Sequence, residues 1–306
     1  MTAAPVVVLA GGTGGAKLAR GMLDLVGDDL VVIANTADDI DVHGAAVSPD
    51  PDLVSFWLAD RIDERGWGLD GDTFEVMDML RELGADVWFN LGDRDLAWCI
   101  ERRRRLDGGE TPTRALAELL RVIGVRARVL PMCDEPVRTR VLARESWFGF
   151  QDFMIRERAL GPVDGVAFDG IDHAAPTAEV LEALAGARAI IIGPSNPVIS
   201  IGPILSVPGM TDALRDAPAP VVAVSPIVDG AVLKGPTAAF MTWAGLPLGA
   251  AGIARAYAPI VDGILADEDR GVADVTLRLA NTLMADADGR RAVAQSALDL
   301  ALELAA

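Results

Sequence analysis

Five aspartates stand close together between positions 38 and 52, in the segment NTADDIDVHGAAVSPDPD. Carboxylates in such a cluster repel one another, which destabilises the chain unless a cation or a helix N-terminus relieves them. One or two of them can simply cap the helix expected over LVSFWLADRI, but that role does not account for all five. Hard oxygen ligands beside a phosphate are typical of Mg²⁺. We therefore predict a magnesium site formed by Asp38, Asp39, Asp50 and Asp52.

A glycine-rich loop precedes this cluster, in the segment AGGTGGAK. Glycines permit positive φ and let backbone N–H groups approach a ligand closely, and a helix N-terminus adds unpaired donors and partial positive charge. The spacing matches neither the Walker pattern nor the dinucleotide fingerprint. The loop therefore has two interpretations. It is either a tight turn between a strand and a helix or a phosphate-binding loop formed by Gly11, Gly12, Thr13, Gly14, Gly15 and Lys17.

Three other segments carry candidate binding residues. Arg94, in NLGDRDLAW, can hold a phosphate or the edge of a planar polar ring. Ser195 and Asn196, in GPSNP, suit a nucleobase, ribose or oxyanion contact, and they equally suit a rigid turn with a helix cap. Lys234, in VLKGPT, can bring a mobile cation to a diphosphate.

Apolar runs and helical patterns alternate along the chain and must position these residues. Runs typical of strands buried on both faces begin at residues 6, 30, 87, 127, 189 and 220. Helical spacing lies between several of them, which predicts βαβ units and an α/β fold with a Rossmann-like, doubly wound, mostly parallel sheet. Loops at the carboxyl ends of such strands form the ligand crevice, so the glycine loop and the acidic loop are expected to meet.

The domain organisation follows from a change of pattern in the middle of the chain. Residues 134–172 indicate strands and turns, and we predict that they form a smaller mixed α/β insertion. Residues 1–133 and 173–306 are predicted to form the core. The Ala- and Leu-rich stretch from Asp274 is predicted to be helical and to cover the sheet, giving C-terminal helices. The run RRRR at 102–105 is interpreted as a solvated helix face.

Composition limits the class of protein. The chain has 306 residues and a formal net charge of −18, which argues against nucleic acid as a partner. No apolar run approaches the roughly 20 residues of a membrane helix, and no secretory signal is visible. Two cysteines give neither a metal spacing nor a disulfide framework. A cytoplasmic protein without membrane or nucleic-acid partners is the expectation.

Six motifs resemble a known family, the 2-phospho-L-lactate transferases of coenzyme F-420 biosynthesis. They are LAGGTGGAKL, NTADDIDVHGAAVSPDPD, LGDRDLA, LPMCDEPVRT, GPSNPVISIGPIL and SPIVDGAVLKGP, and they span residues 6 to about 237 in order. Each is weak alone, whereas six in order are specific. The resemblance implies a Rossmann-like nucleotide- and deazaflavin-binding core, Mg²⁺ as cofactor, and a homodimer.

The resemblance also implies a reaction. Such enzymes move a phospholactyl or phosphoenolpyruvyl group from a guanosine-diphosphate-linked donor to the ribityl hydroxyl of Fo (7,8-didemethyl-8-hydroxy-5-deazariboflavin). GMP leaves, and the product is coenzyme F-420-0 or its dehydro form. Whether the donor is lactyl or enolpyruvyl stays open, because one or two pocket residues could decide it.

The family's site residues map onto this chain position by position. Gly11 to Gly15 match the nucleotide-facing loop, Arg94 matches an arginine associated with deazaflavin binding, and Ser195 and Asn196 match the guanosine-diphosphate segment. The acidic motifs, where metal and deazaflavin meet, match Asp38, Asp39, Asp50 and Asp52. In the mechanism that this implies, one carboxylate accepts the hydroxyl proton, with Asp38, Asp39 and Asp52 as the candidates for catalysis. Pro51, Trp98 and Cys99 depart from the family pattern.

Two rival functions remain to be weighed. A related group shares the fold and the glycine loop but acts as a non-enzymatic, nucleotide-sugar-binding regulatory factor, and the LGDRD and PDPD motifs favour the transferase over it. A Rossmann dehydrogenase requires an acidic residue at the end of the second strand to hold a ribose. Asn35 stands at that place, which disfavours the dehydrogenase.

Overall fold

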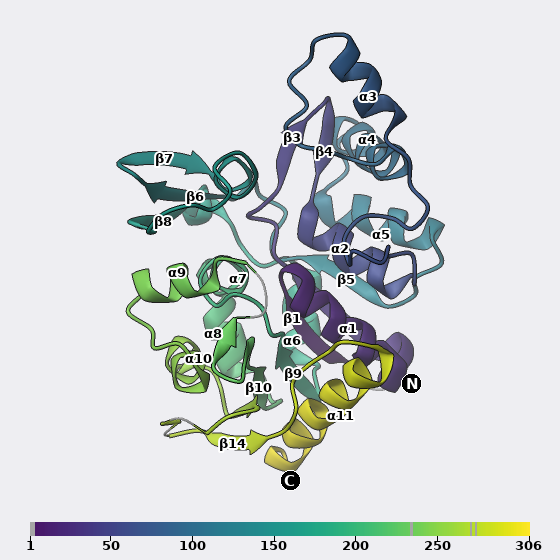
Figure 1. Cartoon of the computed structure of the whole chain (residues 1–306). Helices are drawn as coiled ribbons and strands as arrows, with labels where there is room; N and C mark the ends of the chain where they lie inside the picture. The colour runs from purple at the N-terminus through teal and green to yellow at the C-terminus, as the bar shows by residue number, and fades with distance from the viewer. Residues whose placement is uncertain (1–3, 233–234, 270, 273) are drawn as a thin grey trace.

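A parallel sheet forms the centre of the molecule (Figure 1). The computed structural model describes residues 4–232, 235–269, 271–272 and 274–306. Within these residues seven strands form one sheet, and all neighbouring strands are parallel. In sheet order the strands are β14 (Thr276–Leu279), β13 (Gly263–Ala266), β10 (Val221–Val224), β9 (Ala189–Ile192), β1 (Val6–Ala10), β2 (Leu30–Ala34) and β5 (Arg128–Pro131).

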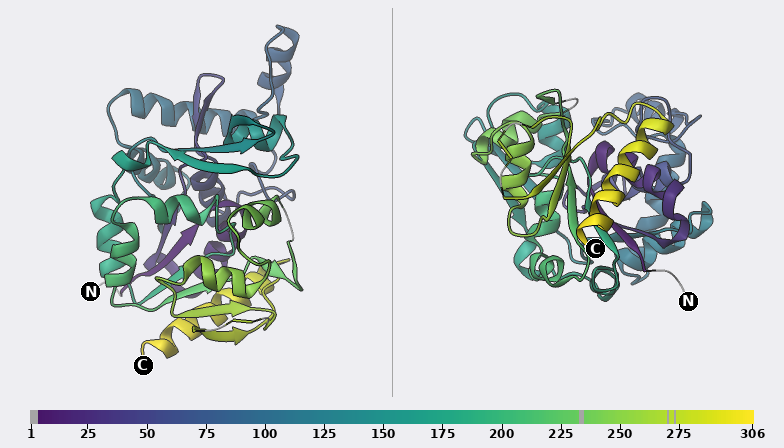
Figure 2. Two further views of the ribbon diagram at one scale, coloured as in Figure 1. Left: turned by 90° about the vertical axis from the view of Figure 1, so that its left-hand side faces the viewer. Right: turned by 90° about the horizontal axis from the view of Figure 1, so that it is seen from below.

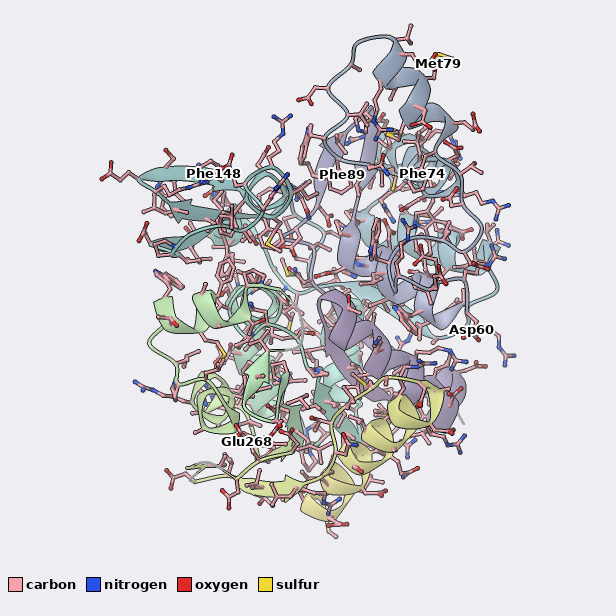
Figure 3. All side chains as sticks on the ribbon, in the orientation of Figure 1. Asp60, Phe74, Met79, Phe89, Phe148 and Glu268 are labelled. Carbon is pink, nitrogen blue, oxygen red and sulfur yellow. The ribbon has the colours of Figure 1, made fainter. Side chains whose placement is uncertain are left out.

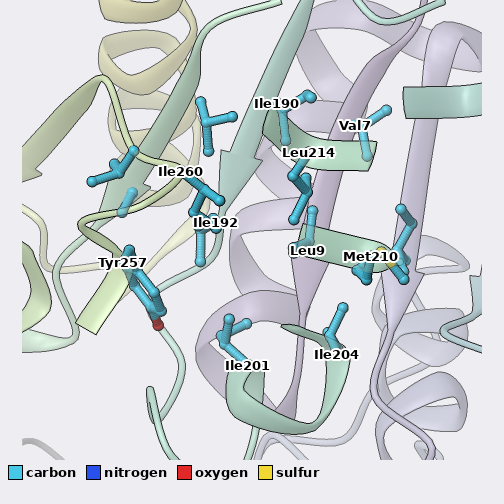
Figure 4. Close-up of a cluster of buried hydrophobic side chains, with 14 of the residues drawn as sticks. Val7, Leu9, Ile190, Ile192, Ile201, Ile204, Met210, Leu214, Tyr257 and Ile260 are labelled. Carbon is cyan, nitrogen blue, oxygen red and sulfur yellow. The ribbon is translucent and has the colours of Figure 1, made fainter. Parts of the chain in front are cut away.

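Helices cover both faces of this sheet, which confirms the predicted doubly wound α/β class (Figure 2). One face packs against α1 (Gly12–Val26), α2 (Pro49–Leu58), α5 (Pro112–Val122) and α11 (Ala287–Leu304). The other face packs against α6 (Ala178–Ala185), α7 (Ile201–Ser206), α8 (Met210–Asp216) and α10 (Ala250–Tyr257). Successive strand side chains point to opposite faces, so Val7 and Leu9 join the second layer, as Figure 4 shows, and Val8 joins the first.

The strand order reverses between β1 and β9. From β1 the chain continues to β2 and β5 on one side, whereas from β9 it continues to β10, β13 and β14 on the other. The loops that leave the carboxyl ends of β1 and β9 therefore diverge and leave a crevice between them. These two loops are the glycine loop and the GPSNP loop.

A separate lobe is built from the chain between β2 and β5. It contains the hairpin β3 (Ile40–Val42) and β4 (Ala45–Val47), with α3 (Glu75–Glu82) and α4 (Asp93–Asp107) beside it. Its own apolar cluster includes Phe56, Trp98 and Cys99. Figure 3 labels two partly buried members of this cluster, Phe74 and Phe89, together with the exposed Met79 of α3.

The segment predicted as an insertion contains a small antiparallel sheet of β6 (Arg138–Ala143), β7 (Ser146–Gly149) and β8 (Gly165–Asp169). A π-helical turn over Asp152–Arg156 follows β7. The division of the chain into a core and an insertion stays a prediction. The remaining elements are α9 (Thr237–Trp243), the hairpin β11 (Ile227–Val228) and β12 (Ala231–Val232), and 3₁₀ turns at Gly27–Asp29 and Ile171–His173.

Two expectations about local structure were wrong. The apolar run at residue 87 is not a strand: Val87, Phe89 and Leu91 pack into the core of the separate lobe, but in the described part of the chain they pair with no strand. The stretch from Asp274 is not helical throughout, because β14 precedes α11 and pairs with β13. In the described part of the chain, no helix has the length and apolar composition needed to span a bilayer.

Candidate functional site

A cavity of about 580 Å³ lies at the crevice between the β1 and β9 loops. The glycine loop, the first turn of α2 and the GPSNP loop all contribute to its wall. Its polar lining includes Gly12, Thr13, Lys17, Asp38, Asp50 and Ser195. The volume is typical of a small-molecule site, and its place at the reversal of strand order is where α/β sheets bind ligands.

The glycines of the first loop allow it to pack directly on the GPSNP loop. A Cβ on Gly14 would lie 2.0 Å from the carbonyl oxygen of Pro194, and one on Gly15 would lie 2.9 Å from Ser195 Oγ. Ser195 Oγ also hydrogen-bonds both the backbone carbonyl and the N–H of Gly11. The glycines thus let the two loops pack closely together beside the cavity, which is compatible with both interpretations of the glycine loop.

Asp50 is bonded to the glycine loop. The Gly12 N–H donates to Asp50 Oδ1 at 2.7 Å, and Asn35 Nδ2 donates to Asp50 Oδ2 at 3.0 Å. Gly12 is the first residue of α1, so the carboxylate lies at the positive end of that helix, where a negative charge is favourable. Asp50 therefore joins α2 to α1 across the wall of the cavity.

Asp38 reaches the same cavity from the loop after β2. Thr139 Oγ1 donates to its Oδ1 at 3.3 Å, and Gln151 Nε2 donates to its backbone carbonyl at 3.0 Å. Thr139 also donates its backbone N–H to Ala37 at 2.7 Å. The small antiparallel sheet and the turn after it thus hold this part of the acidic loop in place.

The buried carboxyls at this edge of the sheet have raised pKa values. Burial, with repulsion from Asp50, raises the pKa of Asp38 well above its ordinary value. Burial also raises the pKa of Asp50 to about 6, against the opposing effect of its hydrogen bonds from Asn35 and Gly12. Two carboxyl groups whose joint ionisation is unfavourable suit a hard divalent cation. The charge of the cation offsets both the lost hydration of the carboxylates and the repulsion between them.

These raised pKa values predict an unusual pH dependence of stability. A buried carboxyl with a raised pKa binds its proton more tightly in the folded chain, so it contributes stability that is present at low pH and is lost as pH rises from about 4 through about 6. We expect the melting temperature of the metal-free protein to fall as pH rises through this range. The fall should be smaller in Asp38→Asn. Thermal melts across pH check this, with the exposed Asp41→Asn as control.

Mg²⁺ should reverse that trend, because it binds the ionised carboxylates only. Its stabilising effect is expected to be larger at about pH 8 than at about pH 5. An effect of equal size at both pH values would contradict a cation bound by Asp38 and Asp50.

Asp39 lies away from the first cavity and lines a second one of about 260 Å³. Ser48 Oγ donates to Asp39 Oδ1 at 2.7 Å, and burial raises the pKa of Asp39 to about 7. Consecutive residues of the acidic loop thus face different cavities. The structure does not bring Asp39 together with Asp50, so the role predicted for Asp39 remains without a supporting contact.

Asp52 is turned toward α4. Trp98 Nε1 donates to its Oδ1 at 2.7 Å, Arg102 Nη1 donates to its Oδ2 at 3.0 Å, and Arg102 Nη2 pairs with its Oδ1. Asp95 and Cys99 each place a potential ligand atom near the carboxylate, all within 4.8 Å of one another, but the guanidinium already occupies both oxygens of Asp52. The roles predicted for Asp52 in metal binding and catalysis remain predictions that these contacts do not support.

The interpretation of the RRRR run as a solvated face was wrong for its first member. Arg102 is only 5% exposed. It falls on the buried stripe of α4 that also carries Leu96 and Cys99. That helical spacing was the signal in the sequence that could have identified it.

The other predicted binding residues lie as follows. Lys17 lines the first cavity, where its Nζ donates to the carbonyl of Met284 at 3.1 Å. Asn196 also lines it, while its Oδ1 accepts the Val198 N–H at 2.9 Å as a turn residue. Arg94 is exposed on the separate lobe, donates to Asp70 and is not part of the first cavity's wall. Lys234 lies outside the described residues.

Several residues of the site were not anticipated. Asn35 bonds Asp50, and Gln151 bonds the backbone of Asp38 while lining the cavity. Phe150 and Met154 form an apolar wall next to Gln151. The segment 282–285, between β14 and α11, closes another side. Among them only Asn35 could have been identified from the sequence, because it directly follows a strand and stands beside the acidic cluster.

Comparison with known proteins gives a consistent result along the whole chain. The family model described as 2-phospho-L-lactate transferase CofD matches residues 6–298. A 2-phospho-L-lactate transferase of Methanosarcina mazei is 39% identical over 265 residues, covering 86% of this chain and 87% of that protein. A phosphoenolpyruvate transferase of Thermobifida fusca is 40% identical over 321 residues, covering 98% of each.

Solved structures show the same fold at greater distance. A crystal structure of a UPF0052 family member from Bacillus halodurans has a TM-score of 0.65 and 19% identity, covering 97% of this chain and 99% of that one. At this identity the likeness supports the fold alone.

Proposed function

The chain belongs to the 2-phospho-L-lactate transferase family, and from that premise we propose that it transfers a phospholactyl or phosphoenolpyruvyl group to Fo. Family membership makes it a transferase of coenzyme F-420 biosynthesis. The donor that we propose is guanosine-diphosphate-linked, the acceptor is the ribityl hydroxyl of Fo, and GMP is released. The observation that carries the proposal is the pair of buried carboxylates, Asp38 and Asp50, beside a glycine loop at the reversal of strand order.

The diphosphate of the donor would bind at the glycine loop. Thr13 and Gly14 lie in the first turn of α1, whose N–H groups have no partner within the helix. They line the cavity, and the helix N-terminus favours an anion there. Lys17, one turn further along α1, adds a positive charge to the same wall. Ser195 and Asn196 complete this end of the cavity.

Asp38 and Asp50 are the residues that would hold Mg²⁺. Both are carboxylates buried in the wall of one cavity, and the raised pKa values show that their joint ionisation is unfavourable without a counter-charge. The bound ion would neutralise charge on the phosphate oxygens during transfer. In this proposal Asp39 and Asp52 support the loop and the helix rather than contact the ion.

The acceptor would lie against the apolar wall. Phe150, Met154 and Ile199 line the cavity and offer a surface for a flat tricyclic ring. In the transfer, the ribityl oxygen forms a bond to the phosphorus that bears the lactyl or enolpyruvyl oxygen, and the bond from that phosphorus to the GMP oxygen breaks. The hydroxyl proton passes to a carboxylate of the site. Positioning and charge stabilisation supply most of the acceleration in such reactions.

The test is direct transfer with purified protein. It is incubated with Fo, Mg²⁺ and either the lactyl or the enolpyruvyl guanosine-diphosphate donor, and the products are identified by mass. Relatives named for each reaction are equally similar to this chain, so both donors are included. We expect GMP and F-420-0 or its dehydro form with at least one donor. Binding of UDP-sugars without turnover of either donor would favour the regulatory alternative.

A homodimer, a cytoplasmic location and the absence of nucleic-acid partners stay predictions. Family membership by itself supports small-molecule substrates.

A further inference from the structure

We propose that Arg102 is a positioning residue for the cavity, although it lies on α4 and is not among the residues that line the cavity. Through Asp52 it fixes the first turn of α2, and so it fixes Asp50 against the Gly12 amide. The importance of this for catalysis rests on the proposed function, whereas the positioning itself does not.

Hydrogen bonds hold the first turn of α2 on two opposite sides. Asp50 and Asp52 are two residues apart in this helix, which separates their directions by about 200°. Asp50 accepts the Gly12 N–H at 2.7 Å, whereas Asp52 accepts from Arg102 and Trp98 of α4. A shift at the Asp52 side would therefore move Asp50 away from α1.

Arg102 donates hydrogen bonds on both sides of the short segment that joins β4 to α2. Its Nη1 donates to the carbonyl of Ala46 in β4 at 2.9 Å and to Asp52 Oδ2 at 3.0 Å. Between these acceptors lies Ser48, whose carbonyl accepts the Asp52 N–H at 3.0 Å. The planar guanidinium suits this fixed, multidentate arrangement, which a single ammonium reproduces only in part.

Burial makes the ion pair sensitive to loss of one partner. Arg102 and Asp52 are 5% and 4% exposed, so water cannot easily replace the guanidinium. Removing one member of such a pair leaves an uncompensated buried charge. Asp52 would then turn toward water, and the first turn of α2 would move with it.

The test compares Arg102→Met with Arg102→Lys and with Arg104→Met. Arg104 is exposed on the same helix, so its variant controls for loss of one positive charge. Two-dimensional NMR of ¹⁵N-glycine-labelled protein follows the Gly12 amide, which reports its hydrogen bond to Asp50 without any substrate. The Mg²⁺ concentration that gives half-maximal turnover, called here the Mg²⁺ constant, is measured in parallel.

We expect Arg102→Met to move the Gly12 amide signal, speed its hydrogen exchange about tenfold or more, and raise the Mg²⁺ constant at least about tenfold. Arg102→Lys should restore much of each effect, and Arg104→Met should match the unmodified protein. A lower melting temperature in Arg102→Met with an unchanged Gly12 signal would overturn the proposal, since that is the result of a purely structural role.

If Arg102→Met does not fold, the same measurement on Trp98→Phe tests the proposal. It removes one hydrogen bond to Asp52 and leaves the ion pair, so a smaller change of the Gly12 signal in the same direction is expected. An unchanged signal would refute the positioning role. If the variants show the Gly12 response while the unmodified protein transfers neither the phospholactyl nor the phosphoenolpyruvyl group, the proposed function is refuted and the positioning role stands.

Discussion

Asp50→Asn is expected to lower the rate of phospholactyl or phosphoenolpyruvyl transfer at least about a hundredfold. The amide retains an oxygen that can accept the Gly12 N–H, so the fold of the loop should survive. It lacks the negative charge, and Asp38 is then the one remaining carboxylate of the pair that lines the cavity. Initial rates at saturating Fo and donor, measured across Mg²⁺ concentrations, check this prediction.

The matched control is Asp41→Asn. Asp41 belongs to the same acidic segment, but it is exposed and pairs with Arg103. Its variant should transfer within about twofold of the unmodified rate, because an exposed ion pair contributes little. Comparable losses of transfer rate in both variants would show that the overall charge of the loop matters, and not the Asp50 carboxylate in particular. Near-normal transfer by Asp50→Asn would remove Asp50 from the mechanism.

Gly14→Ala is expected to weaken binding of GDP, used as a probe for the donor, at least about tenfold, which corresponds to about 1.4 kcal/mol. The new Cβ would lie 2.0 Å from the Pro194 carbonyl oxygen, which is far inside contact distance. The glycine loop and the GPSNP loop must therefore separate, and overpacking of this kind also destabilises a protein by about 1–3 kcal/mol. Calorimetric titration with GDP and thermal melts measure the two effects.

Gly21→Ala separates loss of binding from loss of stability. Its Cβ would lie 2.3 Å from the Arg290 carbonyl oxygen, where α1 packs on α11, so the overlap is similar in kind. Gly21 does not line the cavity. We expect this variant to melt at a lower temperature and to bind GDP normally. If both variants bind GDP equally well, the close packing of the two loops is not needed for the nucleotide.

The edge of the sheet at which the cavity lies could be predicted from the sequence. The runs at residues 6, 30, 189 and 220 are apolar on both faces, which is typical of buried parallel strands, and all four form strands in the sheet. Carboxyl ends of parallel strands share one edge of the sheet. The glycine loop, the acidic loop and the GPSNP loop therefore had to meet at that edge.

The separation of the acidic residues could not be predicted in this way. A helix that begins at LVSFWLADRI, as the sequence predicts, would leave Asp50 and Asp52 before it as caps or joint ligands. The structure begins α2 at Pro49, so both aspartates lie within the helix and point to opposite sides. A difference of a few residues in a helix boundary thus changed which carboxylates can share an ion.

The sequence by itself determined the fold class, the family and the edge of the sheet at which the loops gather, because apolar periodicity and glycine spacing are local properties of the chain. Only the tertiary structure decided which aspartates face the cavity. Asp50 is directed to Gly12 and Asp52 to Arg102, and these partners lie 38 and 50 positions away along the chain. A buried carboxylate settles where a hydrogen-bond donor or a positive charge compensates its lost hydration, and packing alone brings such partners together.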